Sequence, residues 1–67
     1  MITITINGDS KEIPKGSNLE DVLNFFSLPS QRVAVELNKT VVPRREWSTT
    51  TVSDSDKIEV IHFVGGG

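Results

Sequence analysis

Apolar and polar residues alternate at the start of the chain, and this pattern predicts a β-hairpin. The isoleucines of Ile2–Ile6 alternate with threonines, a period of two that is typical of a strand with one buried face. Asn7 and Gly8 follow directly, and both tolerate the positive φ angles of a type I′ turn. The chain is therefore expected to reverse into a second strand over Asp9–Ile13.

The apolar spacing then changes to a helical period. Ser17 is expected to be the N-cap of a helix, with Glu20 completing a capping box. Four apolar residues fall at i, i+3, i+4 and i+7 and form one stripe: Leu19, Val22, Leu23 and Phe26. Pro29 lacks the N–H that would continue a helix, so we expect the helix over residues 18–27.

Three further strands are predicted in the second half of the chain. Val33–Leu37 alternates again, Asn38-Lys39 should turn the chain, and Thr40–Val42 is long enough for a short strand. Residues 43–47 can form only a short helical turn, and the Ser-, Thr- and Asp-rich stretch after it is expected to be a loop. The last strand, over residues 58–64, has the most apolar residues.

This last strand has apolar residues on both faces. Burying Glu59 would be costly, so Ile58 and Val60 are assigned to the core. Ile61 and Phe63 then point to the opposite face, which a single helix cannot also cover. Two explanations remain open at this point: a partner protein covers these two residues, or a loop of the chain does.

The order of elements predicts the fold class. A ferredoxin-like fold would need a second crossover helix, and residues 43–51 are too short and too polar to form one. One helix packed on a mixed sheet of four to five strands, an α+β fold, is the remaining compact solution. We expect one domain over residues 1–64 and a flexible glycine tail over residues 65–67.

Composition and charge narrow the functional classes. The 67 residues have a formal net charge of −2, whereas nucleic acids require a basic face, so no nucleic-acid partner is expected. The chain has no cysteine, which excludes a disulfide framework and a thiolate metal site. No apolar stretch approaches the roughly 20 residues that span a bilayer, and MITITING lacks the pattern of a signal peptide. We expect a soluble, cytoplasmic protein with no membrane partner.

The sequence contains no residue pattern that is typical of catalysis or metal binding. His62 is the only histidine, and no dyad or triad is expected to converge around it. The pair Asp54-x-Asp56 lacks the other ligands of a calcium loop and is expected to be a turn. We therefore expect no bound metal, no cofactor and no enzymatic activity of the chain itself.

The chain ends in three glycines, and the α-carboxylate of Gly67 is the one reactive group presented without obstruction. Residues without Cβ form a thin thread that can enter a narrow active site on another protein, at an entropic cost when the thread is ordered. A frayed terminus without a role is the other interpretation. The residues alone leave both interpretations open.

The end of the chain and a mid-chain segment together resemble a known family. The two segments are FVGGG and VAVELNKTVVPRREW. A terminal Gly-Gly is shared by ubiquitin-like proteins at large. The pattern N-x-x-x-V-P-R-x-x-W is more specific, and its fixed residues are Asn38, Val42, Pro43, Arg44 and Trp47. Over essentially its whole length, the chain resembles the ThiS family of sulfur-carrier proteins of thiamine biosynthesis.

The resemblance implies a β-grasp, ubiquitin-like fold and a role as a co-substrate. In that family a ThiF-like adenylyltransferase uses ATP to convert the terminal carboxylate to an acyl-adenylate. Sulfur from a persulfide donor, such as a cysteine desulfurase, then displaces AMP and leaves a thiocarboxylate, which supplies a ThiG-like thiazole synthase. By this resemblance Gly67 carries the sulfur, Gly65 and Gly66 thread into the partner's active site, and ATP is bound by the partner.

Some features lie outside the family pattern. The family needs two terminal glycines and this chain has three. Gly65 can therefore serve only to lengthen the tail. We expect Ile61 and Phe63 to form the docking face, with Arg44 contributing, on the grounds of pattern and geometry. The rival interpretations are a sulfur carrier for molybdopterin synthesis, a ubiquitin-like modifier joined through Gly67 to lysines, and a plain interaction domain.

Overall fold

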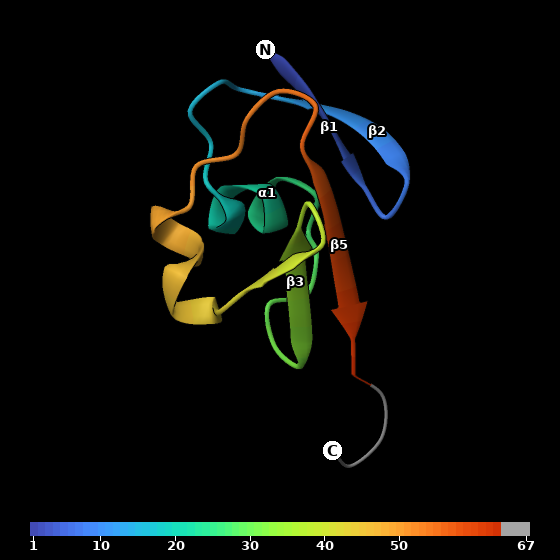
Figure 1. Ribbon diagram of the computed structural model, residues 1–67, viewed down its shortest axis with the longest axis vertical. Helices are drawn as coiled ribbons and strands as arrows, with labels where there is room; N and C mark the ends of the chain where they lie inside the picture. The colour runs from blue at the N-terminus through green and yellow to red at the C-terminus, as the bar shows by residue number, and fades with distance from the viewer. Residues whose placement is uncertain (64–67) are drawn as a thin grey trace.

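The computed structural model describes residues 1–63 of the chain (Figure 1). Its elements are β1 (Ile2–Ile6), β2 (Asp9–Ile13), α1 (Leu19–Phe25), β3 (Val33–Leu37), β4 (Thr40–Val42), the 3₁₀ helix η1 (Arg44–Thr49) and β5 (Lys57–His62). Their order and type are as predicted. The last strand begins one residue earlier than expected and ends at His62 rather than at residue 64, which lies outside the described residues.

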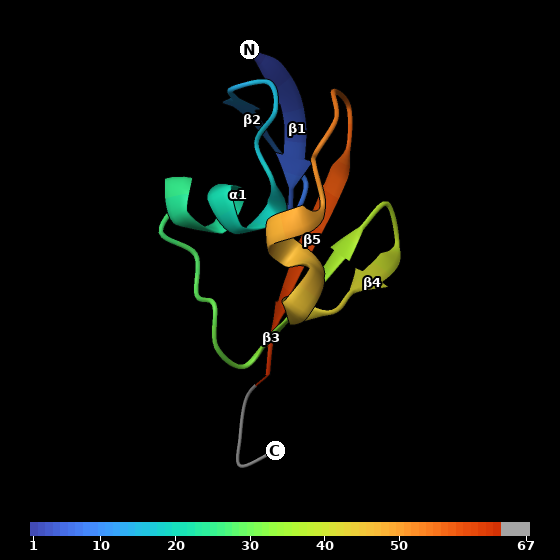
Figure 2. The same cartoon turned by 90° about the vertical axis from the view of Figure 1, so that its left-hand side faces the viewer.

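The strands form one mixed sheet in the order β2-β1-β5-β3-β4. β1 and β5 run parallel at its centre, with Ile6 opposite Ile58, while the other neighbouring strands are antiparallel. Both α1 and η1 lie to the left of β5 in Figure 1, and the view of Figure 2 faces that side. The molecule thus has two layers, a sheet and a helical layer, and the helical layer covers one face.

The core lies between these two layers. Its buried apolar residues come from every element except β4: Ile4, Ile6, Ile13, Leu19, Val22, Leu23, Val35, Trp47, Val52 and Ile58. The alternation predicted for β1 is confirmed, since Ile4 and Ile6 are buried. Trp47 is only 3% exposed, and its indole N–H donates to the carbonyl oxygen of Val42 at 2.9 Å. That bond satisfies the one polar group of the ring inside the core.

The start of α1 corrects the predicted capping box by one residue. Asn18 is the N-cap: its Oδ1 accepts from the Asp21 N–H at 2.7 Å, and the Asp21 carboxylate accepts from the Asn18 N–H at 3.0 Å. Ser17 does not cap the helix, and its hydroxyl donates instead to the carbonyl oxygen of Pro14 at 2.7 Å. Asn18 and Asp21 therefore replace Ser17 and the predicted Glu20 in the box.

The end of α1 is also earlier than residue 27. Ser27 has a φ of +52°, in the left-handed region that a helix cannot continue. Its N–H donates to Asn24, and the N–H of Leu28 donates to Leu23 at 2.8 Å. These two bonds form a Schellman motif, so backbone geometry ends the helix before Pro29 is reached.

The turn after β1 holds the centre of the sheet together. Asn7 has a φ of +49° and Gly8 a φ of +87°, as a type I′ turn requires. The carboxamide of Asn7 also reaches β5, where Oδ1 accepts from the Val60 N–H at 2.8 Å and Nδ2 donates to the Val60 carbonyl oxygen at 3.3 Å. This side chain extends the pairing of β1 with β5 past the end of β1.

We predict that Asn7→Gly lowers the free energy of unfolding by about 1–2 kcal/mol, because glycine keeps the positive φ but loses both bonds to Val60. Denaturant unfolding followed by the fluorescence of Trp47 measures this loss. Lys39→Gly is the matched control, since Lys39 also has a positive φ, of +71°, in a hairpin turn. A loss for Asn7→Gly no larger than that for Lys39→Gly would contradict the role of the carboxamide.

Candidate functional site

The last strand leads to the C-terminal segment of the chain. β5 lies between β1 and β3, and the described residues continue to Phe63. The predicted carrier residue Gly67 and the predicted tail residues Gly65 and Gly66 lie outside the described residues. The surface around β5 is therefore the part of the candidate site that the structure describes.

The two faces of β5 are arranged as the sequence predicted. Ile58 is buried and Val60 is half-buried against the core, whereas Glu59 is exposed. Ile61 is 44% exposed and Phe63 is 54% exposed, so no loop within residues 1–63 covers them. Of the two explanations that the sequence left open, coverage by a loop of the described chain is thus excluded.

Neighbouring strands add residues that the sequence analysis did not assign to this face. In the register of the sheet, Ala34 lies opposite Ile61, and Val41 of β4 lies opposite Glu36 on the same outer face. Val41 is among the exposed large apolar residues. We define the outer patch as Ala34, Val41, Ile61 and Phe63. The alternation of Val33–Leu37 and Thr40–Val42 could have identified Ala34 and Val41, had the strand pairing been known.

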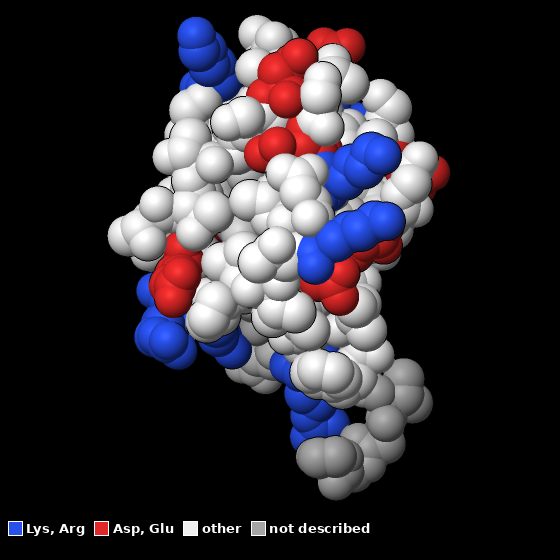
Figure 3. All heavy atoms as spheres, viewed as in Figure 1, with Lys and Arg blue, Asp and Glu red and all other residues white. Residues whose placement is uncertain are grey.

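Two carboxylates lie within this apolar surface. Glu36 of β3 and Glu59 of β5 are directly opposite each other in the register, and neither forms an ion pair with any residue in the described part of the chain. Like charges that face each other across a strand pair destabilise the sheet. On the side of the molecule seen in Figure 3, acidic and basic groups are interspersed.

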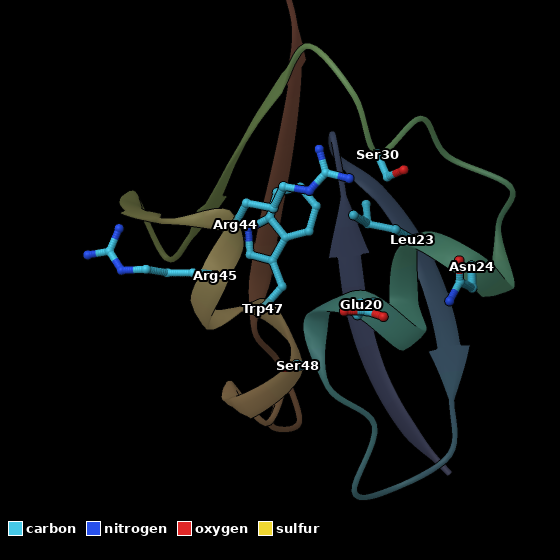
Figure 4. A pocket seen from close by; sticks show the side chains of 8 residues that line it. All are labelled: Glu20, Leu23, Asn24, Ser30, Arg44, Arg45, Trp47 and Ser48. Atoms are coloured by element: carbon cyan, nitrogen blue, oxygen red, sulfur yellow. The ribbon is translucent and has the colours of Figure 1, made fainter.

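Arg44 does not share the face of Ile61 and Phe63. It lies on η1, on the helical side of the sheet, with its guanidinium carbon 5.7 Å from the centre of the Trp47 ring. Arg44 lines a hollow of about 640 Å³. Figure 4 shows Glu20, Leu23 and Asn24 of α1 on the side opposite Arg44. Arg45 also lines this hollow, and its side chain extends away from α1 in Figure 4. The three predicted docking residues are therefore placed on two sides of the molecule.

The acidic residues and the histidine of the described part of the chain do not gather at one place. Within residues 1–63, no cluster of three His, Asp or Glu side chains could hold a metal ion. His62 is exposed at the end of β5. Asp54 and Asp56 form a turn, as expected, because their carboxylates accept backbone N–H groups of Thr3 and Ser53, each at 2.8 Å. In this described part, no helix is long and apolar enough to cross a membrane.

Asn38, one residue of the mid-chain motif, also bonds β5 through its side chain, as Asn7 does. Asn38 lies in the turn between β3 and β4, where its Oδ1 accepts from the Lys57 N–H at 2.9 Å and its Nδ2 donates to Asp56 at 3.0 Å. These bonds fix the point at which β5 begins. The turn pattern of the sequence indicated the position of Asn38 but not this contact.

Comparisons with known proteins agree on one family. The model of the ThiS family matches residues 4–67. The chain is 32% identical over 65 residues to the sulfur carrier protein ThiS of Bacillus subtilis, a match that covers 96% of this chain and 98% of that protein. It is 39% identical over 64 residues to a thiazole synthase of Magnetococcus marinus, a match that covers 96% of this chain and 20% of that enzyme.

A solved structure gives the same result for the fold. The crystal structure of the thiamine biosynthesis protein ThiS from Geobacter metallireducens is similar to this structure with a TM-score of 0.86. The sequences are 32% identical, and the match covers 98% of this chain and 100% of that one. The single helix on a five-stranded mixed sheet is thus the β-grasp fold. Since the family model spans nearly the whole sequence, the chain belongs to the ThiS family.

Proposed function

We propose that this protein is a sulfur carrier of thiamine biosynthesis and that the C-terminal carboxylate of Gly67 carries the sulfur. The observation that supports this most directly is the family match, which extends to Gly67 itself. The relative in Bacillus subtilis, which is named a sulfur carrier protein, aligns over 96% of this chain.

The chemistry requires activation of the carboxylate by a partner. The carboxylate of Gly67 attacks the α-phosphate of ATP in the partner's active site, which releases pyrophosphate and gives an acyl-adenylate. The terminal sulfur of a persulfide then attacks the acyl carbon and displaces AMP. Cleavage of the resulting S–S bond by a thiol leaves the thiocarboxylate. ATP and any metal ion are bound by the partner, so the carrier is a co-substrate.

Three partners follow from this scheme. A ThiF-like adenylyltransferase activates the carboxylate, a persulfide donor such as a cysteine desulfurase supplies sulfur, and a ThiG-like thiazole synthase receives it. The last partner has independent support, since a segment similar to this chain forms part of the thiazole synthase of Magnetococcus marinus. Because the cycle consumes ATP, we place it in the cytoplasm.

We further propose that the outer patch, with Ile61 and Phe63 at its centre, is the docking surface for these enzymes. Exposed apolar side chains on a sheet face that the helical layer does not cover are typical of a partner surface. Glu36 and Glu59 favour a partner that brings a basic side chain to this face. Arg44, on the helical side, would contact a partner only if that partner reaches around η1.

Intact mass spectrometry tests the proposed function. The protein is incubated with a cell extract, ATP and a sulfur source, and a known carrier in the same extract serves as the control. A mass increase equal to the replacement of one oxygen by sulfur supports the thiocarboxylate. An unchanged mass beside an active control contradicts it, and adducts on lysines of other proteins would instead indicate a ubiquitin-like modifier.

We predict that deletion of Gly66 and Gly67 together, which removes the terminal Gly-Gly, abolishes this mass increase and leaves the fold intact. The two glycines have no side chain to pack, and residues 1–63 already form the core, so the free energy of unfolding should change by less than about 1 kcal/mol. Thermal and denaturant unfolding measure the stability of the shortened chain. A larger loss would show that the terminus contributes to the fold, and retained loading would reject Gly67 as the carrier residue.

We predict that Ile61→Asp weakens binding to the adenylyltransferase or the thiazole synthase by about tenfold or more, which is a loss of at least about 1.4 kcal/mol. Its unfolding free energy should fall by less than about 1 kcal/mol, because the side chain is exposed. Titration calorimetry measures the binding.

The matched control for Ile61→Asp is Phe25→Asp. Phe25 is 50% exposed and apolar, but it lies on α1, on the other side of the sheet. Equal loss of binding for both variants would reject the outer patch as the docking surface. Global unfolding of Ile61→Asp would show that Ile61 belongs to the core.

A further inference from the structure

The backbone groups of β5 point alternately to its two neighbours. On the β3 side, the N–H of Phe63 donates to Arg32 at 2.8 Å, which continues the antiparallel register of odd-numbered β5 residues. On the β1 side, the carbonyl oxygen of Ile58 accepts from Asn7 at 2.9 Å. Even-numbered residues of β5 therefore direct both N–H and C=O towards the β1 side.

The pairing on the β1 side ends earlier than the pairing on the β3 side. β1 ends at Ile6, and the chain turns away into β2. The carboxamide of Asn7 then takes the place of a further β1 residue and bonds both the N–H and the carbonyl oxygen of Val60. Val60 is thus the last even-numbered residue of β5 that has a partner on this side within residues 1–63.

His62 is the next residue in the even-numbered series. Its N–H and carbonyl oxygen point to the β1 side, where neither has a hydrogen-bond partner among residues 1–63. Figure 1 shows the lower half of β5 with β3 on one side and no strand on the other. A strand edge of this kind can pair with another chain.

The other edges of the sheet are protected. The edge strand β2 carries charged side chains, among them Asp9, Lys11 and Glu12, and β4 has only three residues and is followed by Pro43. Charges, short length and proline are the usual devices that prevent strands from pairing with other molecules. Residues 61–63 are Ile-His-Phe, with no Lys and no Pro. The edge of β5 beyond Asn7 lacks these protections.

We propose that an extended segment of thiazole synthase pairs with this edge at His62 and adds a strand to the sheet. The inference rests on the proposed function, because it takes its partner from there. Backbone bonds to His62 supply the attachment, and the outward side chains of the added strand lie beside Ile61 and Phe63 of the outer patch. An apolar, extended segment fits this position. His62 is five residues before Gly67. Pairing at His62 would therefore orient the C-terminal end of the carrier relative to the partner.

Amide hydrogen exchange tests the pairing without any substitution. Exchange of the ¹⁵N-labelled chain is measured by NMR, first for the free chain and then in the presence of purified thiazole synthase from the same organism. In the free protein the His62 amide should exchange nearly as fast as an unstructured amide, and binding should slow it by about tenfold or more. The Val60 amide, already bonded to Asn7, is the internal control. Unchanged exchange at His62 in the complex, or no complex at all, overturns the proposal.

Two substitutions distinguish the contribution of the His62 backbone to binding from that of its side chain. His62→Ala keeps the N–H and should bind thiazole synthase like the parent chain, whereas His62→Pro lacks the N–H and should bind about three- to tenfold more weakly. His62→Pro removes no hydrogen bond between β5 and β3, since the N–H of His62 does not point to β3. Equal binding of the two variants rejects the proposal. If His62→Pro does not fold, an N-methyl group on the His62 amide of a chemically synthesised chain replaces it.

The failure of this inference is distinguishable from the failure of the proposed function. Sulfur loading is measured by intact mass and does not depend on the His62 edge being paired with thiazole synthase. Protection of His62 without any loading would reject the carrier function and keep the added strand. Loading without protection would keep the carrier function and reject the added strand.

Discussion

The parallel pairing of β1 with β5 is the constraint on which the rest of the structure depends. It joins two segments that are about fifty positions apart in the chain, with Thr5 opposite Lys57 and Ile6 opposite Ile58. Such a contact closes a long loop, which is entropically costly and is expected to form late in folding. Asn7 and Asn38 compensate by bonding β5 through their side chains, Asn38 at Lys57, where the strand begins, and Asn7 at Val60, further along it. The strand that leads to the C-terminal segment is thereby held at the middle of the sheet.

The open outer face follows from the size of the chain. A domain of 67 residues has few residues beyond those of its sheet and one short helical layer, so only one face of the sheet can be buried. The core takes Ile58 and Val60 on that face, and Ile61 is left on the other. The same strands therefore build the core and the proposed docking surface. Alternate side chains of each strand point to the buried face and to the uncovered face.

Local patterns were enough to predict the strands. They failed at the two ends of α1. The alternation at Ile2–Ile6 and Val33–Leu37 identified strands and buried faces, because one face of each is apolar. The capping box was misplaced because Ser17 and Asn18 are both good N-cap residues, and the sequence does not show at which of them the helix begins. The end of α1 was misplaced because a Schellman motif at Ser27 has no strong residue signal when glycine is absent.

The candidate site was predictable in part for a similar reason. The exposure of Ile61 and Phe63 followed from the cost of burying Glu59, a property of one strand alone. The separation of Arg44 from these residues, and the presence of Ala34 and Val41 beside them, depend on strand order and register, which pairs of distant segments determine. The backbone groups of His62 have no partner among residues 1–63 because β1 stops before this point of β5, and no single segment contains that information.

The contact of Asn7 with Val60 also bears on how the protein ages. Asn7 is followed by Gly8, and an asparagine before glycine is chemically labile, because the backbone nitrogen of the glycine can attack the carboxamide carbon when no side chain hinders it. Ammonia leaves, and water then opens the resulting succinimide to aspartate or isoaspartate. In the folded chain both polar atoms of that carboxamide are bonded to Val60, so the attack requires this contact to open first. The aspartate formed by such a reaction would place a carboxylate oxygen beside the carbonyl oxygen of Val60. Deamidation of this one side chain would then loosen the centre of the sheet, so the lifetime of the carrier is tied to the hydrogen bonds that hold its last strand.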